Sequence, residues 1–278
     1  VFSGIEDPRV PYYFFNQLQP DEENVEGNQI EYRDGGFSSI VFGSTGPNRD
    51  KSHDKSTTVM GIYPAGGRYD DGEGSGGKGV TAGSGTGAAP FRMLTYADRL
   101  FIEAELIQAG VVPGGAAEAK TKLKAALTQA IAQVDYVVAK AGTVNQTVPK
   151  LAGTDEANDF IDAVVNLFEN SSADKQMEII MTQKWISNFG GNAVDCYNDY
   201  RRTKYPMIFD PNNAEMAPDH FFKPPVNGNI ELDEAPLIPV ITSRSYPVSL
   251  PWSQRELELN KNAPDQKTPA SFKVFWMN

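Results

Sequence analysis

Five consecutive segments between Leu94 and Pro206 carry the hydrophobic spacing of amphipathic helices, and this run constrains the fold more than any other part of the chain. Apolar residues recur three and four positions apart, which places them on one face of a helix. The clearest pattern runs from Ala116 to Ala141, with Leu123, Leu127, Ile131 and Val134 on one face, and Gly142 follows. Helices joined by short turns pack as antiparallel pairs around a shared apolar stripe. The sequence therefore predicts a mainly α protein built from helix pairs, with long irregular loops and a few short strands.

Caps and helix breakers separate these segments. Thr154 and Asp155 are expected to cap the third helix, because short polar side chains bond the free amides of a first turn. Asp174 is the expected cap of the fourth helix and Asn192 that of the fifth. The expected buried stripes are Leu94, Ala97, Phe101, Ala104 and Ile107 in the first helix, Phe160, Val164 and Phe168 in the third, Met177, Ile180, Met181, Trp185 and Phe189 in the fourth, and Val194, Tyr197 and Tyr200 in the fifth.

The rest of the chain divides by composition around this helical scaffold, within one domain of residues 1–278. Residues 1–92 are rich in Gly, Pro, Asp and aromatic residues and predict a loop-rich face that carries the ligand site. Residues 93–206 form the helical scaffold, and residues 207–278 predict a second loop-rich stretch that wraps the helices. Ten of the 25 glycines lie between Gly66 and Gly87. Such a stretch does not hold regular structure unaided, because glycine loses the most backbone entropy on ordering.

Charge and cysteine content exclude several classes of protein. The net charge of -11 and pI near 4.7 oppose binding to nucleic acid, which needs a basic surface. No stretch has the roughly 18 consecutive apolar residues that span a bilayer. The single cysteine, Cys196, excludes an internal disulfide and a multi-cysteine zinc site. Its neighbours Val194 and Tyr197 favour an inert core thiol.

No motif in the chain predicts catalysis. His53 and His220 are the only histidines, and neither lies in a nucleophile motif. The segment Gly72–Gly79 resembles a phosphate-binding loop, but Gly79 stands where such a loop has the metal-binding Ser or Thr. We therefore expect no catalytic residue and a protein that is not an enzyme.

Aromatic residues on the loops of residues 1–92 favour a sugar ligand. The C–H faces of a sugar ring stack on aromatic rings, while neighbouring polar side chains bond its hydroxyls. The candidate ligand-binding residues are Tyr63, Arg68, Tyr69 and Asp70. Asp70, Asp71 and Glu73 form a candidate calcium site, because calcium takes several oxygens from a flexible loop. The expected function needs no other cofactor.

Arg201 and Arg202 close the fifth helix. Cations at a helix C-terminus interact favourably with the helix dipole. We expect the two guanidinium groups to pair with acids such as Asp199 or Glu105 of a neighbouring helix, in a structural role.

Several segments, taken in order, resemble the SusD/RagB family, the nutrient-binding lipoproteins on the surface of Bacteroidetes, and its SusD-like branch in particular. The matching segments are DPRVPYYF at Asp7–Phe14, YPAGGRYDDG at Tyr63–Gly72, LTYADRLFIEAELIQAG at Leu94–Gly110, QKWISNFGGNAVDCYNDYRRTKYP at Gln183–Pro206, then IPVITSRSYP, ELELNKN and the terminal FKVFW. Each segment alone is unspecific, but their order along nearly the whole chain is specific.

The resemblance implies a fold, a function and a cellular place. The fold would be an α-α superhelical scaffold of tetratricopeptide-like helix pairs, of which this chain is the C-terminal portion. The protein would bind an oligosaccharide at the outer surface of the outer membrane and deliver it to a SusC-like TonB-dependent transporter. A lipoprotein signal and a lipidated cysteine would lie upstream of Val1, since Cys196 lies inside a helix.

Two other functions remain open. A helical-repeat protein of this kind can bind peptide or another polymer on the concave face of its helices. A secreted glycosidase would need two acids about 5 to 10 Å apart in a cleft. Exposed aromatic residues on the loops of residues 1–92 favour sugar, and aromatic residues in a helical groove favour peptide.

Overall fold

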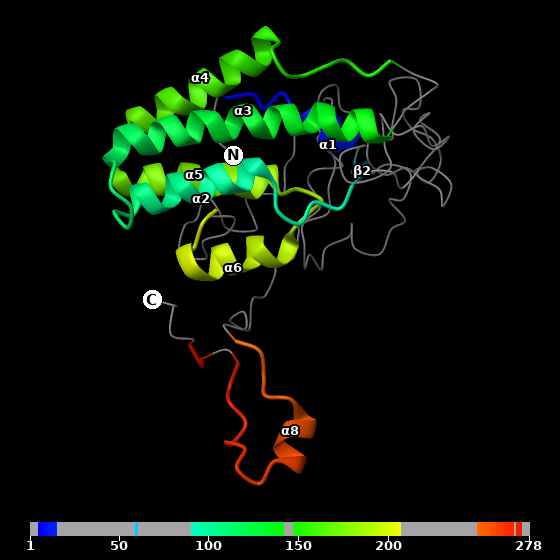
Figure 1. The fold of residues 1–278 in the computed structure, drawn as a ribbon, viewed down its shortest axis with the longest axis vertical. Helices are drawn as coiled ribbons and strands as arrows, with labels where there is room; N and C mark the ends of the chain where they lie inside the picture. The colour runs from blue at the N-terminus through cyan, green and yellow to red at the C-terminus, as the bar shows by residue number, and fades with distance from the viewer. Residues whose placement is uncertain are drawn as a thin grey trace, which may run out of the picture.

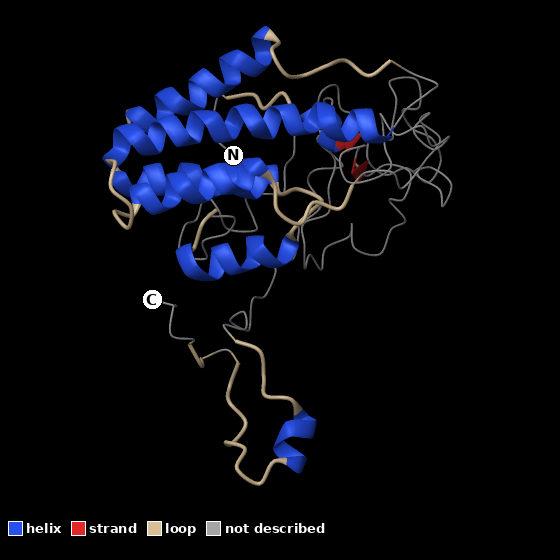
Figure 2. Ribbon diagram, viewed as in Figure 1, coloured by secondary structure: helices blue, strands red, loops and turns tan. Residues whose placement is uncertain are grey.

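The computed structural model describes residues 5–15, 59–60, 90–141, 147–206, 249–269 and 271–273. These residues are mainly helical, with two strands of two residues each (Figures 1 and 2). The predicted mainly α class is therefore confirmed. No helix among the described residues is long and apolar enough to cross a membrane.

Four helices, α2 to α5, pack against one another in antiparallel pairs (Figure 1). The first pair is α2 (Tyr96–Gln108) and α3 (Gly115–Ala141), and the second is α4 (Asp155–Glu169) and α5 (Ala173–Ser187). The two pairs pack together through α2 on α5 and α3 on α4. This arrangement confirms the prediction of successive antiparallel helix pairs.

The two ends of this bundle differ. At one end, residues 109–114 and 170–172 make short connections, and we call it the turn end. There Gln108 Nε2 donates a hydrogen bond to Gln176 Oε1 over 2.9 Å. At the opposite end, which we call the loop end, Asn188 Nδ2 donates to Asp98 Oδ1 over 2.8 Å. The loop end also carries α1, the two strands and the long connections.

The four helices bury one continuous core. Its largest fully buried apolar side chains come from all four helices: Phe101 on α2, Leu123, Leu127 and Ile131 on α3, Phe168 on α4, and Ile179, Ile180 and Met181 on α5. The spacing that predicted α3 and α4 is confirmed, because these side chains fall on the face that meets the neighbouring helices.

Side-chain caps set where the helices begin. The Thr95 hydroxyl accepts from Asp98 N over 3.0 Å, and Asp98 Oδ2 accepts from Thr95 N over 2.8 Å, so both residues satisfy free amides of the first turn. Thr154 caps α4, as predicted. The predicted cap of α5 is wrong, since Ser172 takes that position and Asp174 lies inside the first turn.

The expected stripe of the first helix is correct except at its start. Ala97, Phe101, Ala104 and Ile107 are buried in α2, whereas Leu94 is 72% exposed. The physical reason is that the helix begins at Tyr96 and not at Leu94, so Leu94 lies on the extended segment before the cap.

The fifth predicted helix, α6 (Ala193–Thr203), is present with Asn192 at its cap. Its expected apolar stripe is wrong, because Val194 is 69% exposed and Tyr197 is 40% exposed. Polar side chains of α6 turn toward the bundle, where the facing residues of α2 and α5 are charged. Consequently α6 contains no fully buried residue.

The expected buried face of α5 is also partly wrong. Ile180 and Met181 are buried as predicted, but Trp185 is 38% exposed. The side chains of Gln176, Gln183 and Lys184 are buried instead, because each bonds a polar group on a neighbouring element. A helix with neighbours on two sides does not show a simple amphipathic pattern.

Three short elements among the described residues precede the bundle. The one-turn helix α1 (Val10–Tyr13) leads into β1 (Phe14–Phe15), which pairs antiparallel with β2 (Val59–Met60). In the C-terminal stretch the structure describes one further helix, α8 (Gln254–Leu259). The predicted wrap by residues 207–278 lies largely outside the described residues and stays a prediction.

Candidate ligand-binding face

The residues predicted to bind ligand or calcium lie outside the described residues: Tyr63, Arg68, Tyr69, Asp70, Asp71 and Glu73. The histidines, His53 and His220, lie outside them too. Within the described ranges, no group of three or more His, Cys, Asp or Glu residues could hold a metal ion. What the structure does describe is the framework on both sides of the predicted site.

Both sides of that framework meet at Phe189, just after the end of α5. The ring of Tyr13, directly before β1, stacks on the Phe189 ring with centroids 5.0 Å apart. The guanidinium of Arg92, at the return of the chain to α2, donates to the Phe189 carbonyl over 2.8 Å. The segment that carries the predicted ligand residues follows β2 and ends at Pro90. Its described neighbours on both sides are thus held at the loop end.

The segment 90–96 is held in place by polar contacts. Arg92 is buried, and Asn192 Nδ2 donates to the Met93 carbonyl over 3.0 Å. Thr95 and Asp98 then fix the start of α2 through their reciprocal hydrogen bonds. A backbone fixed at several points presents its side chains at little further ordering cost.

Large apolar side chains point outward from this fixed segment. Phe91 is 78% exposed, Met93 75% and Tyr96 55%, and Leu94 is exposed as well. Exposed apolar side chains that lie this close together mark interaction sites more often than singly scattered ones. The loop end therefore presents a preorganised surface with two aromatic rings, Phe91 and Tyr96.

The aromatic residues of the first 92 positions have two different roles. Tyr12 and Tyr13 are buried and belong to the core, and the Tyr12 hydroxyl donates to the Pro149 carbonyl over 2.8 Å. Phe91, by contrast, is largely exposed. Sequence reasoning did not identify Tyr96, because its place at the first position of α2 looked like ordinary helix. The capping pair Thr95 and Asp98 is the sequence signal that could have identified Tyr96. It fixes the start of α2 at Tyr96, which lies outside the apolar stripe.

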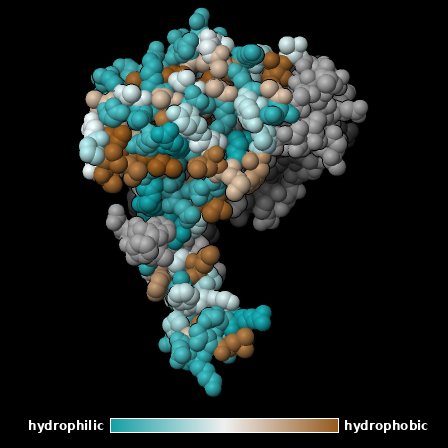
Figure 3. Space-filling model, viewed as in Figure 1, coloured by the Kyte–Doolittle hydropathy of each residue, from teal (hydrophilic) through white to brown (hydrophobic). Residues whose placement is uncertain are grey.

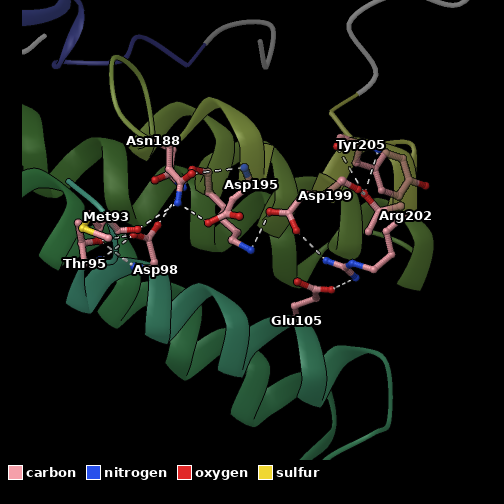
Figure 4. A network of polar contacts seen from close by, with 12 residues as sticks. Met93, Thr95, Asp98, Glu105, Asn188, Asp195, Asp199, Arg202 and Tyr205 are labelled. Carbon is pink, nitrogen blue, oxygen red and sulfur yellow. Dashed lines mark hydrogen bonds and ion pairs between the residues drawn. The ribbon is translucent and has the colours of Figure 1, made fainter. Parts of the chain in front are cut away.

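A chain of charged side chains joins α6 to the bundle (Figure 4). The ammonium of Lys184 on α5 pairs with Asp199 over 2.7 Å, and Asp199 accepts from Arg202 over 2.9 Å. Arg202 also pairs with Glu105 of α2. The predicted pairing of Arg202 with Asp199 and Glu105 is confirmed, and its role is to dock a helix.

The partners keep Arg202 charged. Burial alone would lower the pKa of its guanidinium, but the hydrogen bonds and charges of Glu105 and Asp199 outweigh burial and raise that pKa. Lys184 and Glu105 are almost fully buried, so neither charge is screened by solvent. These groups are satisfied by each other and offer no chemistry to a ligand.

A second buried charge lies beside α1. The guanidinium of Arg9 is fully buried and bonds Asp7 over 2.6 Å and Gln183 of α5 over 2.8 Å. It also lies 5.2 Å from the centroid of the Phe160 ring. Arg9 therefore joins α1 to α4 and α5, and it holds the chain where it enters β1. Sequence reasoning assigned no role to this residue.

Cys196 lies on α6 and is half-buried, so the predicted core position is wrong. The predicted inertness has a physical basis, because burial, followed by the negative charge of Asp199, raises the pKa of the thiol from 9.0 to about 11. At neutral pH the thiol stays protonated, and the thiolate is the reactive form.

We expect Cys196 to react with iodoacetamide about 100-fold more slowly than an unperturbed thiol at pH 7.5, because each pKa unit lowers the thiolate fraction tenfold. The labelling rate should rise steadily with pH up to about 11, the pKa of the thiol. The urea-unfolded protein supplies the control rate. Equal rates for the folded and unfolded protein at pH 7.5 would contradict this assignment.

A separate apolar area lies at the turn end, where Figure 3 shows apolar residues gathered on the surface. The exposed side chains there are aliphatic: Ile102 and Leu106 on α2, then Val111 and Val112. It lacks aromatic rings, so it does not have the chemistry of a sugar site. The two ends of the bundle thus differ in the kind of surface that they present.

Comparison with known proteins identifies a family whose model matches most of the chain. A family model described as SusD-like, starch-binding and associating with the outer membrane matches residues 1–223. No curated protein matches. Among solved structures, a SusD homologue from Bacteroides fragilis is 26% identical with a TM-score of 0.36, over 49% of this chain and 28% of that chain.

Proposed function

Since the chain belongs to the SusD-like family, whose model is described as starch-binding and associating with the outer membrane, we propose that it captures an oligosaccharide at the outer surface of the cell. The match over residues 1–223 is the observation that carries this proposal. The captured oligosaccharide passes to a SusC-like TonB-dependent transporter in the same membrane. A lipid anchor on the full-length protein holds it there.

The surface at the loop end supports sugar binding. Phe91 and Tyr96 are exposed on a segment whose backbone is fixed by Arg92 and Asn192. Each aromatic ring that stacks on a sugar contributes about 1 kcal/mol beyond its buried area. Tyr63 and Tyr69, with Arg68 and Asp70, supply the remaining contacts of this proposed site. Because affinity comes from stacking and hydrogen bonds, no catalytic group is needed.

Calcium is a separate part of the proposal. Asp70, Asp71 and Glu73 would provide carboxylate oxygens to the ion, which holds the ligand loop in one shape. Titration of the chelator-treated protein with calcium tests it. If saturable binding is absent in the wild-type protein, calcium is not part of the site.

We expect the wild-type protein to bind at least one oligosaccharide saturably and without product formation. Tyr63→Ala/Tyr69→Ala should weaken binding by about tenfold or more, because two stacking contacts of about 1 kcal/mol each are lost. Isothermal titration calorimetry against plant, host and microbial oligosaccharides measures the affinity. Chromatography of the same mixtures detects any product.

A matched control uses another exposed tyrosine. Tyr136 lies on α3 and is 56% exposed, so Tyr136→Ala removes the same kind of side chain at a position that is not part of the proposed site. The affinity of the Tyr136→Ala variant for the oligosaccharide should equal that of the wild-type protein. Binding to no glycan would favour a peptide ligand in the helical groove, and release of shorter sugars would favour a glycosidase. Either outcome would overturn the proposal.

A further inference from the structure

The C-terminal stretch 249–273 contains a locally closed segment around Trp252. The Trp252 amide donates to Gln266 Oε1 over 2.8 Å, and Gln266 Nε2 donates back to the Trp252 carbonyl over 3.0 Å. The Ser249 amide donates to the Pro269 carbonyl over 3.2 Å. These three hydrogen bonds join two stretches on either side of α8. They hold the backbone at Trp252 in one place.

A lysine lies between two aromatic rings in this segment. The Lys267 ammonium is 4.1 Å from the centroid of the Trp252 ring and 4.8 Å from that of the Phe272 ring. Both rings remain open to solvent, Trp252 by 39% and Phe272 by 46%. Two rings on one ammonium restrict its rotamers, because each ring attracts the cation. The charge is thereby held at a defined point beside two exposed aromatic surfaces.

This ammonium has no anionic partner in the part of the chain that the structure describes. Lys120, Lys122, Lys124, Lys175 and Lys184 each pair with a carboxylate on the helices. Lys267 contacts the two rings, and no ion pair to it occurs among the described residues. A half-buried cation gains more from an anion than an exposed one does, because solvent screens it less.

The local charge also suits an anion. The described part of 249–273 carries four basic residues, Arg255, Lys261, Lys267 and Lys273, and three acidic ones, Glu256, Glu258 and Asp265. The whole chain carries a net charge of -11. This segment therefore lacks the negative excess that repels anions elsewhere. It also lies beyond residues 1–223, the range that the family model matches.

We propose that Trp252, Lys267 and Phe272 form a second carbohydrate subsite that selects a carboxylated sugar, such as a uronic acid residue. The ammonium of Lys267 pairs with the sugar carboxylate, and the exposed aromatic surfaces stack on the ring. A neutral sugar has the stacking contact alone and leaves the ammonium without a partner. The proposal rests on the proposed function in that the ligand is a glycan.

An oligogalacturonate titration tests the subsite, with the fully methyl-esterified oligomer as a neutral probe that has the same sugar backbone. The wild-type protein should bind the acid form about tenfold more tightly than the ester, because one charge-assisted contact is lost in the ester. Lys267→Gln should remove this difference by weakening only the acid form. Lys267→Arg should retain it, and Trp252→Ala should weaken both forms. Isothermal titration calorimetry at low and high salt gives the affinities.

The control uses another lysine on an aromatic ring. Lys140 on α3 is exposed, and its ammonium lies 5.6 Å from the centroid of one aromatic ring, that of Tyr136. Lys140→Gln should leave the binding of oligogalacturonate unchanged. Circular dichroism of each variant verifies its fold, and Lys267→Gln decides the result even if Trp252→Ala fails to fold.

Three outcomes would overturn the subsite. They are equal affinity of the wild-type protein for acid and ester, unchanged acid binding in Lys267→Gln, and an equal loss in Lys140→Gln. If a neutral oligosaccharide binds through Tyr63 and Tyr69 while oligogalacturonate does not bind, the subsite fails and the proposed function stands. If no glycan of either kind binds, both fail.

Discussion

Asp7→Ala is expected to lower the free energy of unfolding by about 3 kcal/mol, the lower end of the range for breaking a buried ion pair. The variant leaves the fully buried guanidinium of Arg9 without its carboxylate, which lies 2.6 Å away in the wild-type protein. Asp7 itself is 19% exposed, so water can replace part of the lost contact. Urea unfolding followed by circular dichroism gives the difference.

Two further variants separate the cost of the buried charge from the cost of the lost side chain. Asp162→Ala breaks the Lys124 pair, whose side chains are 55% and 68% exposed, and should change stability little. Asp7→Ala/Arg9→Met removes both charges and should recover part of the stability, because no unpaired charge stays buried. Equal losses for Asp7→Ala and Asp162→Ala would contradict the role assigned to Arg9.

Phe101→Ala is expected to lower the free energy of unfolding by about 4 kcal/mol. The Phe101 ring on α2 is 0% exposed and belongs to the core that all four helices share. Its removal loses the burial of the ring and leaves a cavity that the packed helices fill only in part. Urea unfolding followed by circular dichroism measures this loss of stability as well.

The adjacent residue is the natural control for this change. Ile102 follows Phe101 on the same helix but is 37% exposed. Ile102→Ala should cost less than about 1 kcal/mol, because part of its surface is already in water. If both variants lose the same stability, the core does not lie where the structure places it.

How much of the fold was predictable depended on what each helix faces. The helices α3 and α4 each bury one apolar stripe, so the spacing of Leu123, Leu127 and Ile131 or of Phe160 and Phe168 located them correctly. The Thr154 cap was recognisable because capping depends on local geometry. Periodicity predicts such helices well because one face meets the core and the other meets water.

The errors in the buried faces of α5 and α6 fall where polar groups meet polar groups. On α5, Lys184 is buried and Trp185 is partly exposed, because Lys184 pairs with Asp199 of α6. On α6, Val194 turns outward for the same reason. An apolar pattern contains no information about which distant acid will face a lysine, so these faces could not be assigned from spacing alone.

For the candidate site, the sequence predicts a ligand chemistry but not the framework around the site. The aromatic content of the first 92 residues suggested a sugar ligand, and the exposure of Phe91 agrees with that reading. The fixing of segment 90–96 by Arg92 and Asn192 could not be predicted, because both contacts join residues about a hundred positions apart, Arg92 to Phe189 and Asn192 to Met93.

The difference between the two ends of the bundle decides where the chain can change length. The connections 109–114 and 170–172 are short, and the second contains Ser172, the cap of α5, so an insertion there would disturb the start of a helix. The connections at the loop end span long stretches of sequence, and the entropy cost of lengthening such a loop grows only slowly. New loops can therefore be added next to Phe91 and Tyr96 without repacking the core. A scaffold of this kind can acquire a different ligand specificity while its stability stays nearly constant.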